Sequence, residues 1–312
     1  MWGDGFLSRK GSDDNALEHA FAEKRFPVNF SIITPSFNQP DWLRLCLASV
    51  ADQSGVDCKH LVQDASKAQH REATAAVCRE FSRVFLTQES DNGMYDALNR
   101  GFSKSTGDIC GYLNCDEQYL PGSLAKVAAC FQSHPEAEVV FGDALVVDEN
   151  GEYICHRPSL PPRLKHTVIC HFAILTCTLF FRRSLLERGF RFDTNYRAIG
   201  DLELMSRWLE AGVRMRHLPE MLSVFADTGS NLGASVTVTK EMKQLQRRFP
   251  SWWRWGAVVW ASLHRYRKWK AGYYRPQPLD YAIYTRQDAG ARRRFHVDRP
   301  TAIWKSRLSV AG

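Results

Sequence analysis

The chain has 312 residues, 44% of them hydrophobic and 24% charged, which is ordinary for a soluble globular protein of one large or two small domains. No apolar run approaches the roughly 20 residues of a spanning helix, which disfavours an integral membrane protein. The net charge of +7 resides in the C-terminal part, where residues 240–312 carry 17 Lys and Arg against 4 Asp and Glu. The rest is acidic, so the body of the protein is not expected to bind nucleic acid.

The first half of the chain alternates between predicted strands and predicted helices. Residues 1–27 are polar and unpatterned, which predicts a loose N-terminal arm. A turn is predicted at 35–39, after the first strand, and Pro40 then suits the first position of a helix. The predicted strands are 30–34, 58–63, 84–86 and 109–113, with helices after the first three. This alternation is typical of a Rossmann-like, mostly parallel α/β sheet with helices on both faces.

The second half predicts further strands and one clear helix. Strand 139–142 leads into a hairpin around 149–151, and a Pro-rich loop follows at 158–165. A strand is predicted at 179–181 and a helix at 201–211, with Gly212 as its C-cap.

Two acidic residues follow predicted strand ends. In parallel sheets the ligand site lies at the carboxyl ends of the strands, so Asp64 and Asp116 are expected to converge. Asp64 could accept hydrogen bonds from a base or a ribose. The alternative is a surface turn residue.

The tetrad Asn114, Cys115, Asp116 and Glu117 is the first candidate for chemistry. A divalent metal can hold the charge on a departing diphosphate, and hard metals favour oxygen ligands, so Asp116 is the natural ligand. Asn114, two residues earlier, can point the same way. A solvated turn at the strand end remains the alternative for this tetrad alone.

Two helix starts carry the other candidates. Asp96 and Asn99 share one helical face, and Gly93 permits a close backbone approach at the helix N-terminus. The alternative is a polar helix face. Asp201 begins a helix, where a carboxylate can be an N-cap or a general base for an acceptor hydroxyl.

The order of these segments carries a family resemblance. The chain reads Pro-Ser-Phe-Asn at 35–38, Asp-Asn-Gly-Met-Tyr-Asp-Ala-Leu-Asn-Arg-Gly at 91–101, Thr-Gly-Asp-Ile-Cys-Gly-Tyr-Leu-Asn-Cys-Asp-Glu at 106–117 and Gly-Asp-Leu-Glu-Leu at 200–204. It closely resembles family 2 glycosyltransferases of the GT-A fold, in the subgroup that builds bacterial capsule, exopolysaccharide and lipopolysaccharide. The resemblance covers residues 30–231, and 90–117 is its most specific stretch.

The resemblance implies an inverting transferase that uses Mn²⁺ or Mg²⁺ and a nucleotide-sugar donor. Asp116 would bind the metal, and Asp201 would be the catalytic base acting on a glycan or lipid-linked acceptor. We expect a nucleotide-sugar-binding half at 28–120, an acceptor-binding half at 121–235 and a C-terminal extension at 236–312. The donor-site residues implied are Pro35, Ser36 and Phe37 at the nucleobase, Asp64 at the base or ribose, Asp91, Asp96 and Asn99 along the donor, and Asn114, Cys115 and Asp116 at the end of the fourth strand.

Three departures from the family pattern affect these expectations. The usual Asp-Gly-Ser-Thr-Asp-Gly loop is Asp-Ala-Ser-Lys-Ala-Gln at 64–69. The first carboxylate of the usual Asp-x-Asp motif is Asn114, and the usual Glu-Asp base motif is Gly200-Asp201. Only one residue of that last motif is therefore left as a base.

The cysteines and the N-terminus bear on the cellular compartment. Nine scattered cysteines without a CxxC pair indicate neither a disulfide framework nor a zinc site. The N-terminus lacks the layout of a signal peptide, so we expect a cytoplasmic protein.

The C-terminal extension predicts a membrane contact. Residues 240–312 have a net charge of +13, and six of the nine tryptophans follow residue 250. Trp, Tyr and basic residues favour an anionic membrane surface, so the enzyme is expected to be peripheral on the cytoplasmic face of the inner membrane. Packing of the aromatics on the catalytic domain is the alternative. Single-stranded nucleic acid is disfavoured.

Two rival functions fit the sequence less well. A nucleotide-sugar-binding scaffold without turnover has no need of Asp116 and Asp201. A nucleotidyltransferase usually has a Gly-rich basic loop after the first strand, and residues 35–38 do not form one.

Overall fold

The computed structural model describes residues 28–229, 236–275 and 277–304. The predicted N-terminal arm, residues 1–27, lies outside the described residues, as does the end of the predicted acceptor-binding half. No helix in the described ranges is long and apolar enough to cross a membrane.

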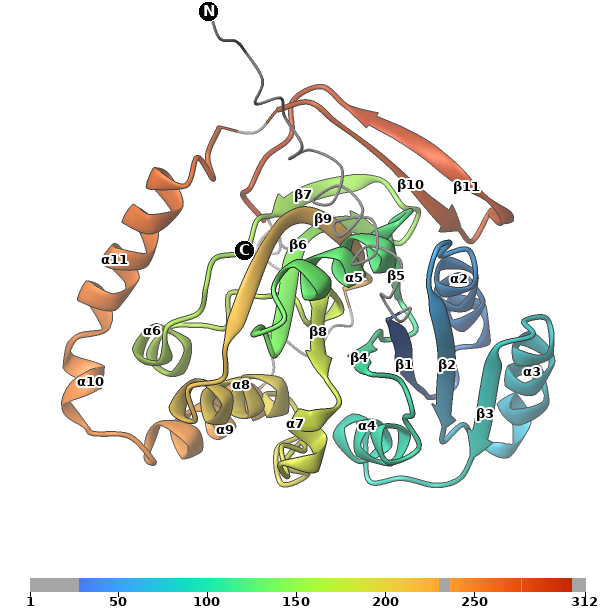
Figure 1. The fold of residues 1–312 in the computed structure, drawn as a ribbon, viewed down its shortest axis with the longest axis horizontal. Helices are drawn as coiled ribbons and strands as arrows, with labels where there is room; N and C mark the ends of the chain where they lie inside the picture. Colours follow the sequence, from blue (N-terminus) through green and yellow to red (C-terminus); the bar gives the residue numbers. More distant parts are fainter. Residues whose placement is uncertain (1–27, 230–235, 276, 305–312) are drawn as a thin grey trace, which may run out of the picture.

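The first half of the chain forms the predicted parallel sheet (Figure 1). Strand β1 pairs in parallel with β2 and β4, and β2 pairs in parallel with β3. The elements are β1 (Asn29–Ser36), α2 (Pro40–Ala51), β2 (Asp57–Asp64), α3 (Ala68–Arg79), β3 (Val84–Gln88), α4 (Met94–Ser103) and β4 (Ile109–Tyr112).

The second half makes the sheet mixed. Its elements are β5 (Glu117–Tyr119), α5 (Ser123–Ser133), β6 (Val139–Asp148), β7 (Tyr153–Arg157), α6 (Leu164–Ile169), the 3₁₀ turn η1 (Thr176–Thr178), β8 (Leu179–Arg182), α7 (Ser184–Glu187), α8 (Gly200–Glu210) and β9 (Met215–Asp227). The nine-stranded sheet has the order β3-β2-β1-β4-β8-β6-β9-β5, with β7 beside β6. Strand β8 runs antiparallel to both β4 and β6, so the parallel arrangement is limited to the first four strands and the β6–β9 pair.

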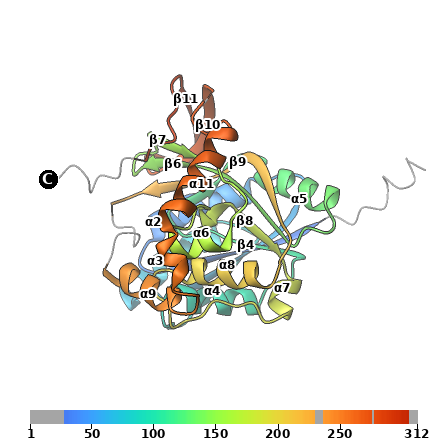
Figure 2. The same ribbon diagram turned by 90° about the vertical axis from the view of Figure 1, so that its left-hand side faces the viewer.

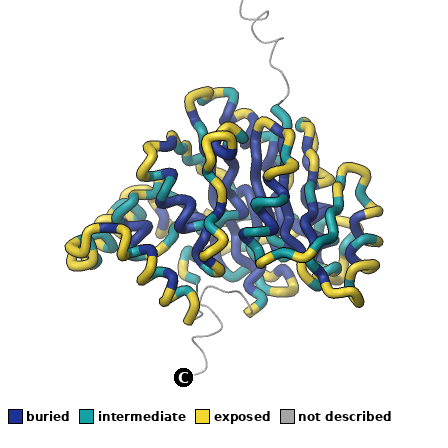
Figure 3. Tube along the Cα trace, turned by 90° about the horizontal axis from the view of Figure 1, so that it is seen from below, coloured by how far each residue is buried: buried dark blue, intermediate teal, exposed yellow. Residues whose placement is uncertain are grey.

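Helices cover both faces of the sheet because neighbouring residues of a strand point to opposite sides. Ile32 of β1 packs in the cluster that contains Val50 of α2, with α3 and α5 on the same face. Ile33, the next residue, packs with Leu98 of α4 in the cluster that includes Trp208 of α8. Figure 3 shows the resulting buried strands between exposed outer helices.

The C-terminal extension is docked along two sides of this body. It consists of α9 (Val236–Gln246), α10 (Trp252–Trp255), α11 (Ala257–Lys270), β10 (Leu279–Thr285) and β11 (Asp288–Val297). Helices α10 and α11 both contact α6, and Figure 2 shows α11 beside α6, whereas the β10–β11 hairpin lies near α2 (Figure 1). Tyr281 and Ile283 of β10 are buried against Val147 and Val224 of the main sheet.

The hairpin is also tied to β5 by polar contacts. The side-chain amide of Gln118 bonds both backbone groups of Tyr284, donating to its O (2.8 Å) and accepting from its N (2.9 Å). Arg292 donates to Tyr119 O at 2.9 Å and to Asp52 Oδ1 at 2.7 Å. The hairpin therefore holds β5, the strand that begins at the last residue of the acidic tetrad.

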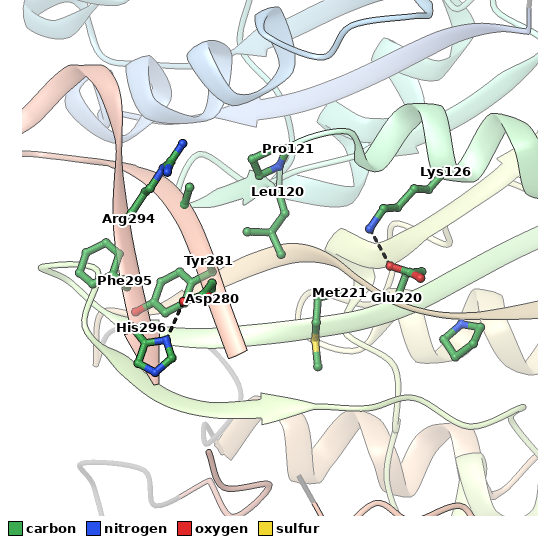
Figure 4. Close-up of a pocket in the computed structure, with 12 residues that line it drawn as sticks. Leu120, Pro121, Lys126, Glu220, Met221, Asp280, Tyr281, Arg294, Phe295 and His296 are labelled. Carbon is green, nitrogen blue, oxygen red and sulfur yellow. Dashed lines mark hydrogen bonds and ion pairs between the residues drawn. The ribbon is translucent and has the colours of Figure 1, made fainter. Parts of the chain in front are cut away.

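A hollow of about 790 Å³ lies between the β10–β11 hairpin and the body (Figure 4). The stacked pair Tyr281 and Phe295 forms one wall, and the Lys126–Glu220 ion pair stands on the opposite side. Its lining includes none of the residues predicted for the donor or for catalysis.

Candidate functional site

The carboxyl ends of three parallel strands bring polar side chains into line. In the strand register Ser36 lies beside Asp64, and Asp64 beside Gln88. Asp64 is fully buried, with Oδ1 accepting from Ser66 Oγ at 2.6 Å and Oδ2 from Gln88 Nε2 at 3.0 Å. Both carboxylate oxygens therefore already bond to protein side chains, and any contact with a base or ribose must use their remaining lone pairs.

The loops after β1 and β2 are fastened to each other. Asn38 N donates to Ser66 Oγ at 2.7 Å, and Asn38 Oδ1 accepts from Lys67 N at 2.9 Å. Asn38 has a positive φ of 56°, a conformation that asparagine tolerates better than most residues. These hydrogen bonds give a defined conformation to the loop at 64–69, whose sequence differs from the usual family pattern.

The residues predicted to line the nucleobase pocket sit directly before this junction. Pro35 and Ser36 are buried in β1, whereas Phe37 is 56% exposed. An exposed aromatic ring beside a strand end can stack on a flat base. The nucleobase assignment of these three residues stays a prediction.

The acidic tetrad turns back toward the end of β1. Cys115 Sγ lies 3.4 Å from Pro35 O, and Glu117 Oε2 accepts from Asn114 N at 2.7 Å. Asp116 is partly exposed, whereas Glu117 is buried. The turn thus presents Asp116 at the sheet edge with a second carboxylate behind it.

The carboxyl groups of Asp116 and Glu117 both have raised pKa values. Burial raises the pKa of Asp116, and burial together with the charge of Asp116 raises the pKa of Glu117. The charge of Asp201 contributes to the raised pKa of Glu117 as well, so Glu117 lies within electrostatic reach of both aspartates. Paired acids of this kind suit a divalent cation, whose charge would favour their ionised forms.

Asp201 occupies the first turn of α8. Its Oδ1 accepts from Leu202 N at 2.8 Å and from the Tyr95 hydroxyl at 3.2 Å. Gly200 allows this contact, because a Cβ there would lie 2.7 Å from Tyr95 ring atoms. Desolvation raises the pKa of Asp201, which makes it a better proton acceptor.

The start of α4 holds the other predicted donor residues. Asp91 Oδ1 accepts from Gly93 N at 2.8 Å, and Asp96 Oδ2 accepts from Asn92 N at 2.9 Å. Burial alone would raise the pKa of Asp96, but the Asn92 hydrogen bond and an ion pair with Arg100 outweigh it and lower the pKa. These carboxylates shape the loop at the N-terminus of α4.

Asn99 has a role that its sequence position did not predict. Its Nδ2 donates to Phe192 O at 2.9 Å, and its Oδ1 accepts from Phe192 N at 3.0 Å. The amide thereby fixes the backbone ahead of α8. Its predicted place along the donor is not tested by this contact and stays a prediction.

Comparison with known proteins identifies the chain at this point. The family model for Glycosyl transferase family 2 matches residues 31–190, about half of the chain. The chain belongs to glycosyltransferase family 2. The matched region contains the strand-end network and the acidic tetrad.

Relatives and solved structures of glycosyltransferases agree with this assignment. The chain is 27% identical over 276 residues to a PGL/p-HBAD biosynthesis glycosyltransferase of Mycobacterium bovis, covering 85% of this chain and 98% of that protein. It is 32% identical over 236 residues to the O-antigen biosynthesis protein RfbC of Myxococcus xanthus, covering 73% of this chain and 18% of that protein.

A solved structure confirms the expected GT-A type fold. S. aureus TarS 1–349 in complex with UDP-GlcNAc superposes with a TM-score of 0.55 at 17% identity, covering 70% of this chain and 64% of TarS. At that identity the likeness shows the fold alone.

Two further residues of this glycosyltransferase, Arg197 and Glu241, lie near the site although no sequence motif points to them. Gly93 has φ +102°, and a Cβ there would lie 2.8 Å from Arg197 Nη1. The exposed side chain of Arg197 thus stands beside the N-terminus of α4.

Glu241 of α9 holds the loop that leads into α8. Its buried carboxylate accepts from the backbone N atoms of Arg197 (2.7 Å), Ala198 (2.9 Å) and Ile199 (3.1 Å). Asp201 follows two residues later. A helix of the C-terminal extension therefore positions the predicted base of the glycosyltransferase, a link between distant segments that the sequence order conceals.

Proposed function

We propose that this family 2 enzyme is an inverting glycosyltransferase acting in surface polysaccharide or glycolipid biosynthesis. It moves a sugar from a nucleotide-diphosphate sugar to a hydroxyl of a glycan or lipid-linked acceptor. The observation that carries the proposal is the placement of three carboxyl groups: Asp116 and Glu117 adjoin in the turn after β4, and Asp201, held by Tyr95 and Leu202, lies near enough for its charge to raise the pKa of Glu117. The relatives' roles in PGL/p-HBAD and O-antigen biosynthesis support the class of product.

The donor half of the proposal rests on the strand-end network. The nucleotide would lie against residues 35–37 and Asp64, with its diphosphate toward Asp116. Mn²⁺ or Mg²⁺ would bind Asp116, with Glu117 beside it, because hard cations favour carboxylate oxygens. When bound, the metal would offset negative charge on the departing diphosphate.

The acceptor half rests on Asp201. We infer that its carboxylate takes the proton of the acceptor hydroxyl as the oxygen attacks the anomeric carbon and the bond to the diphosphate breaks. The Tyr95 hydroxyl and Leu202 N hold the carboxylate in place. Attack from the face opposite the diphosphate inverts the anomeric centre.

The scaffold alternative is tested by turnover. A screen of nucleotide sugars for released nucleoside diphosphate, with and without Mn²⁺, should find a donor that the enzyme hydrolyses or transfers. Binding of donors without release of any diphosphate, in the presence of an acceptor extract, would favour the scaffold.

Glu241 should be a positioning residue for the base. Glu241→Ala removes the acceptor of three backbone N–H groups, so we expect kcat to fall by about 100-fold, the cost of a small misplacement of a catalytic group. Donor affinity should change little, because Asp116 and Asp64 lie on other elements. Steady-state kinetics and donor titration measure the two effects.

The matched controls for this prediction are Glu241→Gln and Glu72→Ala. The glutamine keeps one acceptor oxygen and should fall between the wild type and the alanine variant. Glu72 lies on the surface of α3 and has an exposed ion pair with Arg79, so its loss should leave kcat unchanged. Equal kcat values for Glu241→Ala and the wild type would remove Glu241 from the positioning role.

The aromatics of the extension divide into packed and exposed groups. Trp253 stacks on Phe249 at 5.2 Å, and Trp260 Nε1 donates to Trp253 O at 3.1 Å. Trp255 is 87% and Val258 77% exposed. The outward face of α10 and α11, here called the aromatic face, consists of Trp252, Trp255, Val258, Val259, Leu263, Tyr266 and Trp269.

We infer that the aromatic face docks the enzyme on the anionic cytoplasmic surface of the inner membrane, where a lipid-linked acceptor would be presented. Its residues on α11, from Val258 to Trp269, recur at helical spacing on one side of that helix. Exposed basic residues Arg254, Arg265 and Lys270 lie on the same two helices. Each basic residue near an anionic surface contributes about 1 kcal/mol, and buried aromatic rings would add orientation.

The double variant Trp255→Ser, Val258→Ser should bind anionic vesicles at least about tenfold more weakly. This factor corresponds to a loss of about 1.4 kcal/mol of binding free energy. Sedimentation with phosphatidylserine-containing vesicles measures it. Substitution is sharper than truncation before Arg247, since truncation also removes Tyr281 and Ile283 from the core.

Phe85→Ser is the matched control, since Phe85 is an exposed aromatic on β3. It should bind vesicles as the wild type does. Equal binding by all three proteins, or by none, would contradict membrane docking through this face.

A further inference from the structure

Three histidines from separate segments meet where α6 contacts α11. His166 lies on α6, His171 follows it, and His264 lies on the inner side of α11. The rings of His166 and His264 stack at 3.9 Å, and His171 stands edge-on to His166 at 4.7 Å. One ring nitrogen of each lies within 4.8 Å of those of the other two. Nothing in sugar transfer accounts for this grouping.

Three buried nitrogens of this cluster lack hydrogen bonds to any described residue. His166 and His264 are each 5% exposed. His166 Nε2 and both ring nitrogens of His264 have no partner in the part of the chain that the structure describes. Native proteins rarely leave buried polar atoms unpaired, so these nitrogens call for a ligand.

The surroundings keep the three imidazoles neutral. Burial, helped by nearby cations, lowers the pKa of His166 and His171 to about 4 and that of His264 to about 3. The facing charged groups are Lys268 and Arg267 of α11 and Arg157 of β7. A neutral imidazole has a free lone pair at neutral pH, which is the form that ligates metals.

We propose that His166, His171 and His264 bind one Zn²⁺ ion that joins α6 to α11. Three imidazole nitrogens are a known zinc ligand set, and His171 is exposed, which leaves a fourth position open to water or an anion. The neighbouring cations favour an anion there. Mn²⁺ and Mg²⁺ favour oxygen ligands, so this site is chemically distinct from the one at Asp116.

The location of the site links two parts of the enzyme. Helix α11 carries the aromatic face, and Val168 of α6 packs with Ile199 and Leu202 around the start of α8. Zn²⁺ between α6 and α11 would hold the aromatic face at a fixed angle to the helix that carries Asp201.

The test is Zn²⁺ titration of the full chain after chelator treatment, against a chromophoric competing chelator. We expect one bound Zn²⁺ in the wild type. His171→Ala and His264→Leu should each weaken it by more than about 100-fold, since even the outer-shell partners of a ligand contribute 10–100-fold. His171 is exposed, so its variant should fold normally. His70→Ala, on α3, is the matched control and should bind as the wild type does.

Two further readouts separate this site from the donor site. Zn²⁺ should raise the Tm of the wild type and of Asp116→Asn, but not that of His171→Ala. No Zn²⁺ bound by the wild type, or equal affinity in the wild type and both histidine variants, overturns the proposal. So does loss of Zn²⁺ in Asp116→Asn alone, which would place the ion at the donor site.

Discussion

Asp201→Asn should lower kcat by about 10²–10⁴-fold, the usual contribution of a general base, with donor affinity nearly unchanged. The asparagine side chain has the size of the aspartate and keeps an oxygen to accept from Leu202 N and Tyr95. It cannot take a proton from the acceptor hydroxyl. The loss should therefore appear in kcat and in kcat/KM for the acceptor, while ground-state donor contacts persist.

Donor titration of the inactive variant is the control for this experiment. A variant that no longer binds donor would assign Asp201 to a structural cap of α8 instead. Unchanged turnover would remove it from catalysis altogether. Tyr95→Phe adds a graded case, because it removes one hydrogen bond to the base and keeps the ring that packs over Gly200.

Asp116→Asn should reduce turnover at least about 100-fold, the scale of losing one electrostatic stabiliser of a developing negative charge. The change removes the more exposed carboxylate of the pair and leaves the buried Glu117 in place. Release of nucleoside diphosphate, measured over a range of Mn²⁺ concentrations, gives both kcat and the apparent metal affinity. Full activity of this variant in EDTA would contradict the assignment of a metal to Asp116.

The pH dependence of metal affinity gives an independent check. Burial raises the pKa of Asp116 to about 6, and a carboxylic acid must lose its proton before it ligates a metal. Mn²⁺ affinity should therefore fall as the pH drops through about 6 and rise toward neutrality. The raised pKa of Glu117 should extend the rise to higher pH. A flat profile would indicate that neither carboxyl group takes part.

The sequence determined the parallel half of the sheet, and it predicted that the ligand edge lies at the carboxyl ends of those strands. Strand and helix signals there are local, since alternation and turn residues act within a few positions, and the structure confirms them. Asp64 and Asp116 could be placed at strand ends for the same reason. The family resemblance added the fold type, which the comparisons confirm.

Apart from the predicted hairpin of β6 and β7, strand pairing in the second half could not be predicted in this way. Strand β8 lies between β4 and β6, and β9 between β6 and β5, so each neighbour is far away along the chain. The apolar pattern of β6 or β8 states only that the strand is buried. Which strand pairs with it depends on how the whole sheet closes.

Only the tertiary structure brought the remaining residues to the site. Glu117 lay inside the predicted tetrad, but its burial against Asp116 depends on the return of β5 beside β9. Glu241 reaches the loop before α8 from a segment tens of residues away. In the separate histidine cluster, His264 reaches His166 and His171 in the same way. No spacing rule connects Glu241 with the backbone before α8, or His264 with His166. Local sequence patterns determine helices and strands. The contact of a carboxylate with a loop that is distant in the sequence depends instead on how the complete chain packs.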